Sequence, residues 1–179
     1  MTAYVALLRG INVGRHVRIG MAELRAMLAE LGCSAPRTLL QSGNLIFGDD
    51  TRSSDDLERL LEAQIEGRFG QRVDCFVRSA AQWKSVVANN PFVREAQSDP
   101  AHVVAMVLRD RPPAECREAL RAACDGPELV ATHDRTAYIV YPVDIGNSRL
   151  TNAVVEKHLG TRGTARNWNT VLRLAANLV

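Results

Sequence analysis

The 179-residue sequence has no long hydrophobic run and no segment that resembles a targeting signal. A membrane-spanning helix needs about 20 consecutive apolar residues, and no run approaches that length. Arg9 interrupts the apolar run Val5–Leu8, and no small-residue cleavage site follows it, so a signal peptide is not predicted. We therefore expect a cytoplasmic protein that does not enter a membrane.

The sequence also lacks the residue spacings that define metal, nucleotide and nucleophile sites. The four cysteines have no C-x-x-C spacing and the four histidines are scattered, so buried thiols are expected and no metal site is predicted. Gly10 and Gly14 bracket a loop without the Gly-Lys-Ser/Thr ending of a phosphate-binding P-loop. Ser42 precedes Gly43 but has no glycine two residues before it, as a nucleophile elbow requires. No catalytic residue and no cofactor are predicted.

Aromatic residues make up only 5% of the sequence, which bears on nucleic-acid recognition. RNA-binding sheets of the ferredoxin-like type stack bases on aromatic side chains of two neighbouring strands. The corresponding strands here offer only Tyr4 and Phe47, and no RNP1-like string is present. Base-specific RNA recognition by such a sheet is therefore not predicted, whereas contact between basic residues and phosphate remains open.

Lysine is scarce, and positive charge collects at the two ends of the chain. Only two of the 22 basic residues are lysine, and arginine suits fork-like recognition of phosphate or carboxylate, although genomic base composition is the simpler explanation. Residues 1–20 carry a net charge of +3 and residues 148–179 carry +4, whereas the 14 bases and 19 acids between them give −5. The overall charge of +2 is too small to demand a nucleic-acid partner, and a positive face forms only if the two ends meet.

Hydrophobic periodicity and turn residues predict a first subdomain over residues 1–78. Strands and helices follow the order β-α-β-β-α-β of the ferredoxin-like fold. A hairpin turn is expected at Gln41–Asn44, with Gly43 at positive φ, and a capping box of Asp55 and Glu58 is expected in the second helix. The six predicted elements are Tyr4–Arg9, Met21–Leu31, Arg37–Leu40, Asn44–Phe47, Ser53–Phe69 and Val73–Arg78.

Residues 79–101 are predicted to connect this subdomain to a second one over residues 102–179. The connection consists of a helix, Ser79–Ala88, opened by a Ser79-x-x-Gln82 capping box, and a linker, Phe92–Ala101. The same order of elements then repeats, with a helix added at the C-terminus. The predicted elements are His102–Leu108, Pro112–Cys124, Glu128–Thr132, Ala137–Tyr141, Ser148–Leu159, Thr161–Ala165 and Trp168–Leu178. We therefore predict an α+β protein of two related subdomains, without a visible residue-level repeat.

Two predicted helix starts have the composition of anion-binding sites. A helix N-terminus has unpaired N–H groups and about half a positive charge. The segments Gly146–Arg149 and Arg166–Thr170 contain no acid and one arginine each. Such ends can hold an anion, although Asn and Ser are equally typical of ordinary N-caps. Together with the basic loop in Tyr4–Arg18, they indicate a candidate anion-binding surface.

Seven strings spread along the chain are characteristic of one bacterial family. They are Leu7–Gly14, Met21–Gly32, Gln41–Phe47, Asn90–Phe92, Gly146–Asn152, Glu156–Thr161 and Arg166–Leu174. On these strings the sequence resembles the family catalogued as domain of unknown function 1697, whose members often have a second glycine where this chain has Arg15. The resemblance implies a compact α+β fold of two related subdomains. It implies no activity, cofactor or catalytic residue, because the family's function is unknown.

These observations lead to one leading hypothesis and two alternatives. We expect a module that binds a phosphate-bearing ligand, either a nucleotide or a nucleic-acid backbone, rather than an enzyme. One alternative is a small transferase or hydrolase that uses Ser42 or Lys157 near the same arginines. The other is a structural or protein-interaction protein in which Trp168 belongs to the core. The predicted ligand-binding residues are Arg9, Asn12, Arg15, Arg18, Ser42, Asn44, Ser148, Arg149, Lys157, Arg166, Asn167 and Asn169.

Overall fold

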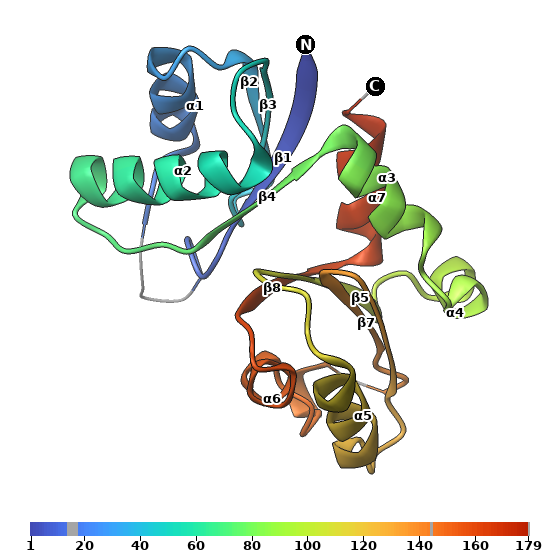
Figure 1. The fold of residues 1–179 in the computed structure, drawn as a ribbon. Coiled ribbons are helices and arrows are strands. Elements are labelled where there is room, and N and C mark those ends of the chain that lie inside the picture. The colour runs from blue at the N-terminus through green and yellow to red at the C-terminus, as the bar shows by residue number, and fades with distance from the viewer. Residues whose placement is uncertain (14–17, 144, 179) are drawn as a thin grey trace. The chain divides into compact units, whose positions relative to one another are not determined.

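The computed structural model describes residues 1–13, 18–143 and 145–178, and contacts between residues divide it into two compact units (Figure 1). The first unit comprises Met1–Lys84 together with Leu174–Val179, and the second comprises Ser85–Arg173. Each unit is built on one four-stranded sheet. Within the described ranges, no helix is both long and apolar enough to cross a membrane.

The first unit has the topology expected of a ferredoxin-like unit. Its strands follow the order β2-β3-β1-β4, and every neighbouring pair is antiparallel. Both helices lie on the same side of the sheet in Figure 1. The elements are β1 (Thr2–Leu8), α1 (Met21–Glu30), β2 (Ser34–Leu39), β3 (Asn44–Asp49), α2 (Ser54–Phe69) and β4 (Cys75–Ser79).

The core of the first unit forms between this sheet and its two helices. Alternate residues of β1, including Ala6 and Leu8, face it because successive side chains of a strand point to opposite faces. The helices contribute residues spaced three or four apart, such as Leu24 of α1 and Leu57 of α2. Each fully buried side chain of this size stabilises the fold by about 1.5–3 kcal/mol.

The second unit repeats the topology, so the predicted fold class is confirmed. Its strand order is β6-β7-β5-β8, again with antiparallel neighbours, and α5 and α6 pack beside each other over a second core. Two helices, α3 (Ala80–Ala88) and α4 (Val93–Ser98), connect the two sheets. The remaining elements are β5 (Val103–Leu108), α5 (Ala114–Ala123), β6 (Leu129–His133), β7 (Thr136–Val140), the 3-10 turn η1 (Ile145–Asn147), α6 (Asn152–Leu159), β8 (Gly163–Asn167) and α7 (Trp168–Ala176).

Corresponding strand ends are joined by the same backbone hydrogen bond in both units. In the first unit, the N–H of Arg9, just after β1, donates to the carbonyl of Asp74 (3.0 Å), just before β4. In the second unit, the N–H of Arg109, just after β5, donates to the carbonyl of Arg162 (2.8 Å), just before β8. Arg9 therefore corresponds to Arg109, and Asp74 corresponds to Arg162, although the sequence alone shows no repeat.

The start of α2 differs from the prediction. The capping box is formed by Ser53 and Asp56, since the Ser53 hydroxyl accepts from the Asp56 N–H (3.2 Å), and the predicted pair of Asp55 and Glu58 is wrong. Glu58 is instead buried and accepts hydrogen bonds from the Val77 N–H (2.8 Å) and from Arg78 (3.1 Å). A buried carboxylate requires such partners.

Two predictions for the connecting and C-terminal segments are also corrected. The expected linker contains α4, whose Ala96 is buried. The helix expected to begin at Ser148 begins at Asn152, with Thr151 as its N-cap. Ser148 lies before this helix, where its hydroxyl donates to Glu128 and accepts from the Leu150 N–H. The predicted capping box at the start of α3 is confirmed, with both hydrogen bonds between Ser79 and Gln82 present.

The prediction that the cysteine thiols are buried is correct for two of the four. Cys33 and Cys75 are buried, whereas Cys116 and Cys124 are half-buried, and all four are free. Cys124 follows the last residue of α5 and packs against the core of the second unit.

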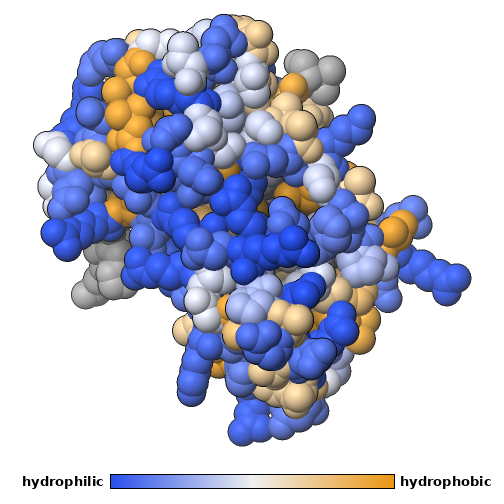
Figure 2. Space-filling view, viewed as in Figure 1, coloured by the Kyte–Doolittle hydropathy of each residue, from blue (hydrophilic) through white to orange (hydrophobic). Residues whose placement is uncertain are grey.

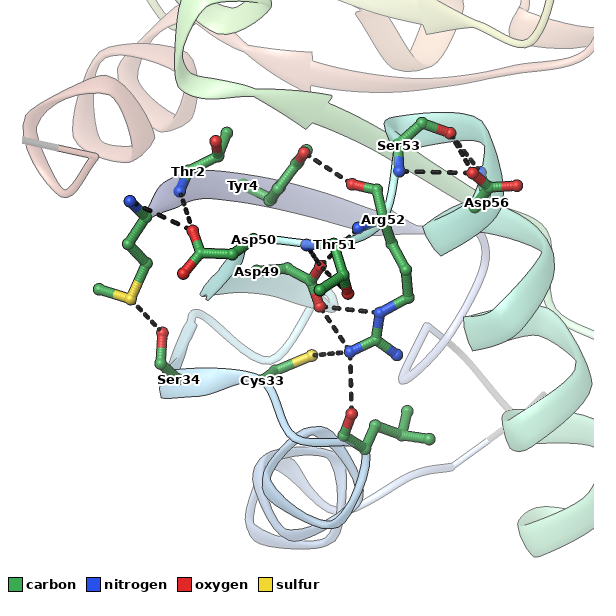
Figure 3. Close-up of polar contacts among 12 residues, drawn as sticks. Thr2, Tyr4, Cys33, Ser34, Asp49, Asp50, Thr51, Arg52, Ser53 and Asp56 are labelled. Atoms are coloured by element: carbon green, nitrogen blue, oxygen red, sulfur yellow. Dashed lines mark hydrogen bonds and ion pairs between the residues drawn. The ribbon is translucent and has the colours of Figure 1, made fainter.

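An ion pair at the end of β3 holds the turn that leads into α2 (Figure 3). The Asp49 carboxylate is buried and pairs with Arg52, whose Nη2 lies 2.5 Å from Oδ2. It also accepts from the backbone N–H groups of Thr51 (2.9 Å) and Arg52 (2.8 Å). Burial by itself raises the pKa of Asp49, but the hydrogen bonds from Arg52 and Thr51 outweigh it and hold the pKa below its ordinary value.

Replacement of Asp49 with Asn is expected to lower the free energy of unfolding by about 2–3 kcal/mol, because Arg52 then loses its buried counter-charge. A carboxyl whose folded pKa is depressed stabilises the fold above its unfolded pKa, and the contribution is lost as pH falls through the folded pKa. Urea titrations between neutral and strongly acidic pH should therefore show a steeper acid loss for the wild type than for Asp49→Asn. The control, Asp50→Asn at an exposed neighbour, should cost under about 1 kcal/mol.

Candidate functional site

Two of the predicted residues of the first loop, Arg9 and Asn12, form contacts within the first unit. The Arg9 guanidinium lies 3.8 Å from the Asp74 carboxylate. The Asn12 amide donates to the carbonyls of Gln41 (2.9 Å) and Ile19 (3.0 Å), and its Oδ1 accepts from the Ile19 N–H. Arg18 is exposed, and Arg15 lies outside the described residues. Asn12 thus joins both ends of the loop to the neighbouring turn.

The turn between β2 and β3 holds the other two candidates of this unit. Asn44 is fully buried, and its amide donates to the carbonyl of Leu39 (2.7 Å) and to the hydroxyl of Ser42 (3.1 Å). The polar atoms of this turn therefore stabilise the turn itself, as the hairpin prediction implied.

Gly43, in the same turn, meets two constraints at once. Its φ is +78°, as predicted, which favours glycine. A Cβ atom there would lie 2.7 Å from Cδ1 of Ile11 and 2.9 Å from Cβ of Leu8. Its carbonyl also accepts from the Leu8 N–H (2.8 Å). The turn at Gly43 therefore packs directly against Leu8 and Ile11.

The second-unit candidates fall into three places. Ser148 and Arg149 line a cavity of about 280 Å³ together with Glu128. Lys157 lines a separate groove of about 490 Å³. Arg166, Asn167 and Asn169 lie at the junction of β8 and α7.

Arg166 and Asn167 are used inside the fold. The Arg166 guanidinium donates to the Thr164 hydroxyl (3.0 Å) and the Ala165 carbonyl (2.8 Å), and burial lowers its pKa to about 10. The Asn167 side chain accepts from the N–H (3.0 Å) and hydroxyl of Thr170 and so caps α7. Asn169 is exposed. The start of α7 is thus capped by a protein side chain.

Trp168 belongs to the core, as the structural alternative expected. It is 5% exposed and meets Tyr138 edge-on, with ring centroids 6.5 Å apart. Its backbone N–H donates to the carbonyl of Pro100 (3.1 Å).

The groove beside Lys157, here named the basic groove, gathers three cationic side chains. Arg109 comes from the end of β5, Lys157 from the last turn of α6, and Arg162 from the segment before β8. Two acids also line it, giving a net charge of +1. Glu156 accepts from the Gly163 N–H (2.8 Å), and Asp110 accepts from the Thr161 hydroxyl (3.2 Å). Both carboxylates are therefore oriented by donors of the protein.

Arg109 and Arg162 were not predicted as site residues. They meet because β5 and β8 are neighbours in which Leu108 is paired with Gly163. The signal was present in the predicted topology, since the first and last strands of a ferredoxin-like unit are antiparallel neighbours, which brings the end of one to the start of the other.

The corresponding place in the first unit has a different charge. There Arg9 faces an acid, Asp74, whereas Arg109 stands beside a second arginine. Asp110 and Glu156 also line the groove of the second unit, where the lining residues sum to +1. Among the described residues, no cluster of three or more His, Cys, Asp or Glu side chains could hold a metal ion.

The fold defines an α+β protein of two ferredoxin-like units, and the second unit has a basic groove at the end of its central strand. The chain matches the family described as "Protein of unknown function (DUF1697)" over residues 1–138 and belongs to that family. The strings in residues 146–174 lie beyond the matched range.

The structure also resembles a solved protein. The conserved bacterial protein SP0830 from Streptococcus pneumoniae superposes with a TM-score of 0.72 at 20% sequence identity, covering 99% of each chain. This likeness supports the fold. No curated protein matches the sequence.

Replacement of Gly43 with Ala is expected to cost about 2 kcal/mol more than the same change at Gly32, because overpacking adds to backbone strain. Gly32 is a matched control, since its φ is +80° and its Cβ would meet nothing within 4 Å. Strain alone should cost Gly32→Ala about 1 kcal/mol. Chemical unfolding of both variants gives the comparison, and equal costs would show that the contact with Ile11 and Leu8 is unimportant.

Proposed function

We propose that this protein binds a phosphate-bearing ligand, a nucleotide or a nucleic-acid backbone, in the basic groove of its second unit. The observation that carries the proposal is the convergence of Arg109, Lys157 and Arg162 on one open groove whose two carboxylates are engaged by the protein. Arginine offers paired N–H donors to phosphate, and lysine acts as a point charge.

The position of α6 indicates that an anion in the groove would be attracted by lysine and arginine side chains and not by the end of this helix. Gly160 ends this helix in the left-handed conformation, so the groove receives the helix's C-terminal end. That end is partially negative and repels an anion. Lys157 offsets this charge, as basic residues in a last turn commonly do, and the two arginines supply the remaining attraction.

The candidate residues support the binding of a ligand more directly than they support catalysis. A reaction by Ser42 requires an adjacent base, and the Ser42 hydroxyl accepts from Asn44 within the hairpin turn. Lys157 lies in the groove and serves a binding role without further assumptions. On the face shown in Figure 2, hydrophilic residues cover much of the surface and apolar residues form separate areas.

Replacement of both Lys157 and Arg162 with Ala is expected to weaken binding of a fluorescent oligothymidylate at least about tenfold at low salt. The slope of log affinity against log salt should fall by about 0.7 for each phosphate that the variant no longer neutralises. Fluorescence anisotropy between about 50 and 200 mM salt measures both quantities. Competition by ATP and by inorganic phosphate distinguishes a nucleotide site from a backbone site.

The matched control is Lys84→Ala with Arg72→Ala, which removes the same two residue types from exposed positions of the first unit. This variant has the same net charge as the test variant and should keep wild-type affinity within about twofold. Arg162→Asp, which introduces the residue type that the first unit has at Asp74, should abolish binding. Equal losses in test and control variants, or no binding of any phosphate-bearing probe, would refute the proposal.

A further inference from the structure

The second cavity of the second unit has a chemistry opposite to that of the basic groove. We name it the Glu128 cavity, after the carboxylate in its wall. It has a volume of about 280 Å³, is open to solvent, and lies between the end of α5, the start of β6 and the segment that follows β7. It is independent of the groove, with which it shares no lining residue.

The Glu128 carboxylate is held in place by Ser148. The Ser148 hydroxyl donates to Oε1 of Glu128 and accepts from the backbone N–H of Leu150 (3.0 Å). The hydroxyl is thus bonded in both directions, which fixes its own orientation and that of the carboxylate. An ionised carboxylate accepts at about four positions, so this one bond leaves capacity for a ligand.

Neighbouring groups experience a negative potential in the cavity. Burial raises the pKa of the Cys124 thiol, and the charges of Glu128 and Asp125 raise it further. Burial raises the pKa of Tyr141 to about 12, and Glu128 adds to the shift. Among the lining residues that the structure describes, the charged ones are Asp125, Glu128 and Arg149, which sum to −1.

The rest of the wall is mainly apolar. Pro127, Val143, Leu150 and Val154 line it, together with the ring of Tyr141. The Tyr141 hydroxyl donates to the Leu150 carbonyl (2.9 Å), so the polar end of this side chain is satisfied within the protein. A mainly apolar cavity with a few placed polar groups is the usual form of a small-molecule site.

We propose that the Glu128 cavity binds a small organic ammonium ion. The N–H groups of the ligand donate to the Glu128 carboxylate, and its apolar body packs against the proline, aliphatic and tyrosine wall. The volume of about 280 Å³ limits the ligand to roughly one ring with a short side chain, since small-molecule sites usually span about 300–1,000 Å³.

Three probes of nearly the same shape test the charge preference. Benzylamine, benzyl alcohol and benzoate are titrated into the full-length protein, and backbone amide signals are followed by two-dimensional NMR. Benzylamine should bind at least about tenfold more tightly than the other two, because a charge-assisted hydrogen bond exceeds a neutral one. The shifted signals should come from residues 124–130, 141–143 and 147–150.

Three variants test the role of Glu128. Glu128→Gln keeps the shape and an acceptor for Ser148, and should weaken benzylamine about tenfold without affecting benzyl alcohol. Ser148→Ala, which releases the carboxylate, should weaken benzylamine less than Glu128→Gln does. The control Glu118→Gln removes an exposed carboxylate of α5 that does not line the cavity and should leave affinity unchanged.

Two results would overturn the proposal. One is binding of benzoate as tightly as benzylamine, which would assign the cavity to Arg149. The other is unchanged benzylamine affinity in Glu128→Gln, with an NMR spectrum showing that the variant is folded. Neither result affects the phosphate proposal, which depends on different residues.

Discussion

The pairing of each central strand with two neighbours is the constraint on which both units depend. β1 lies between β3 and β4, and β5 lies between β7 and β8. Both central strands are almost wholly buried, so their backbone groups must be paired within the sheet. The fixed register then determines which residues meet where the strands end. Arg9 is placed beside Asp74, and Arg109 beside Arg162.

The same strand arrangement therefore carries a different charge pattern in each unit. In the first unit an arginine and an acid face each other at the strand ends. In the second unit two arginines meet there and Lys157 joins them from α6. The same helix contributes Val154 to the Glu128 cavity, so α6 separates a cationic groove from an acidic cavity. The two units therefore differ in the charge at these strand ends, a difference that the net charge of +2 for the whole chain does not reveal.

Several residues that stand out in the sequence owe their identity to packing and hydrogen bonding. Asn12 ties the first loop to the next turn, Asn44 closes that turn, and Asn167 caps α7. Gly43 is required by both its positive φ and the approach of Ile11. Buried amides need partners, and asparagine supplies a donor and an acceptor together. Such residues are difficult to distinguish from ligand contacts without coordinates.

The sequence by itself determined the order of the main elements, the ferredoxin-like topology and the Gly43 turn, because periodicity, turn chemistry and capping residues act over short distances. The family was recognised from its characteristic strings. The sequence offered Lys157 as a candidate binding residue, but it did not single out Arg109, Arg162 or Glu128, which line the groove and the cavity. It also misplaced the start of α6, whose N-cap is Thr151, and it did not show that Ser148 is bonded to Glu128, 20 residues away. Strand register and contacts distant in sequence decided those features, and they depend on side chains that meet only when the chain has folded.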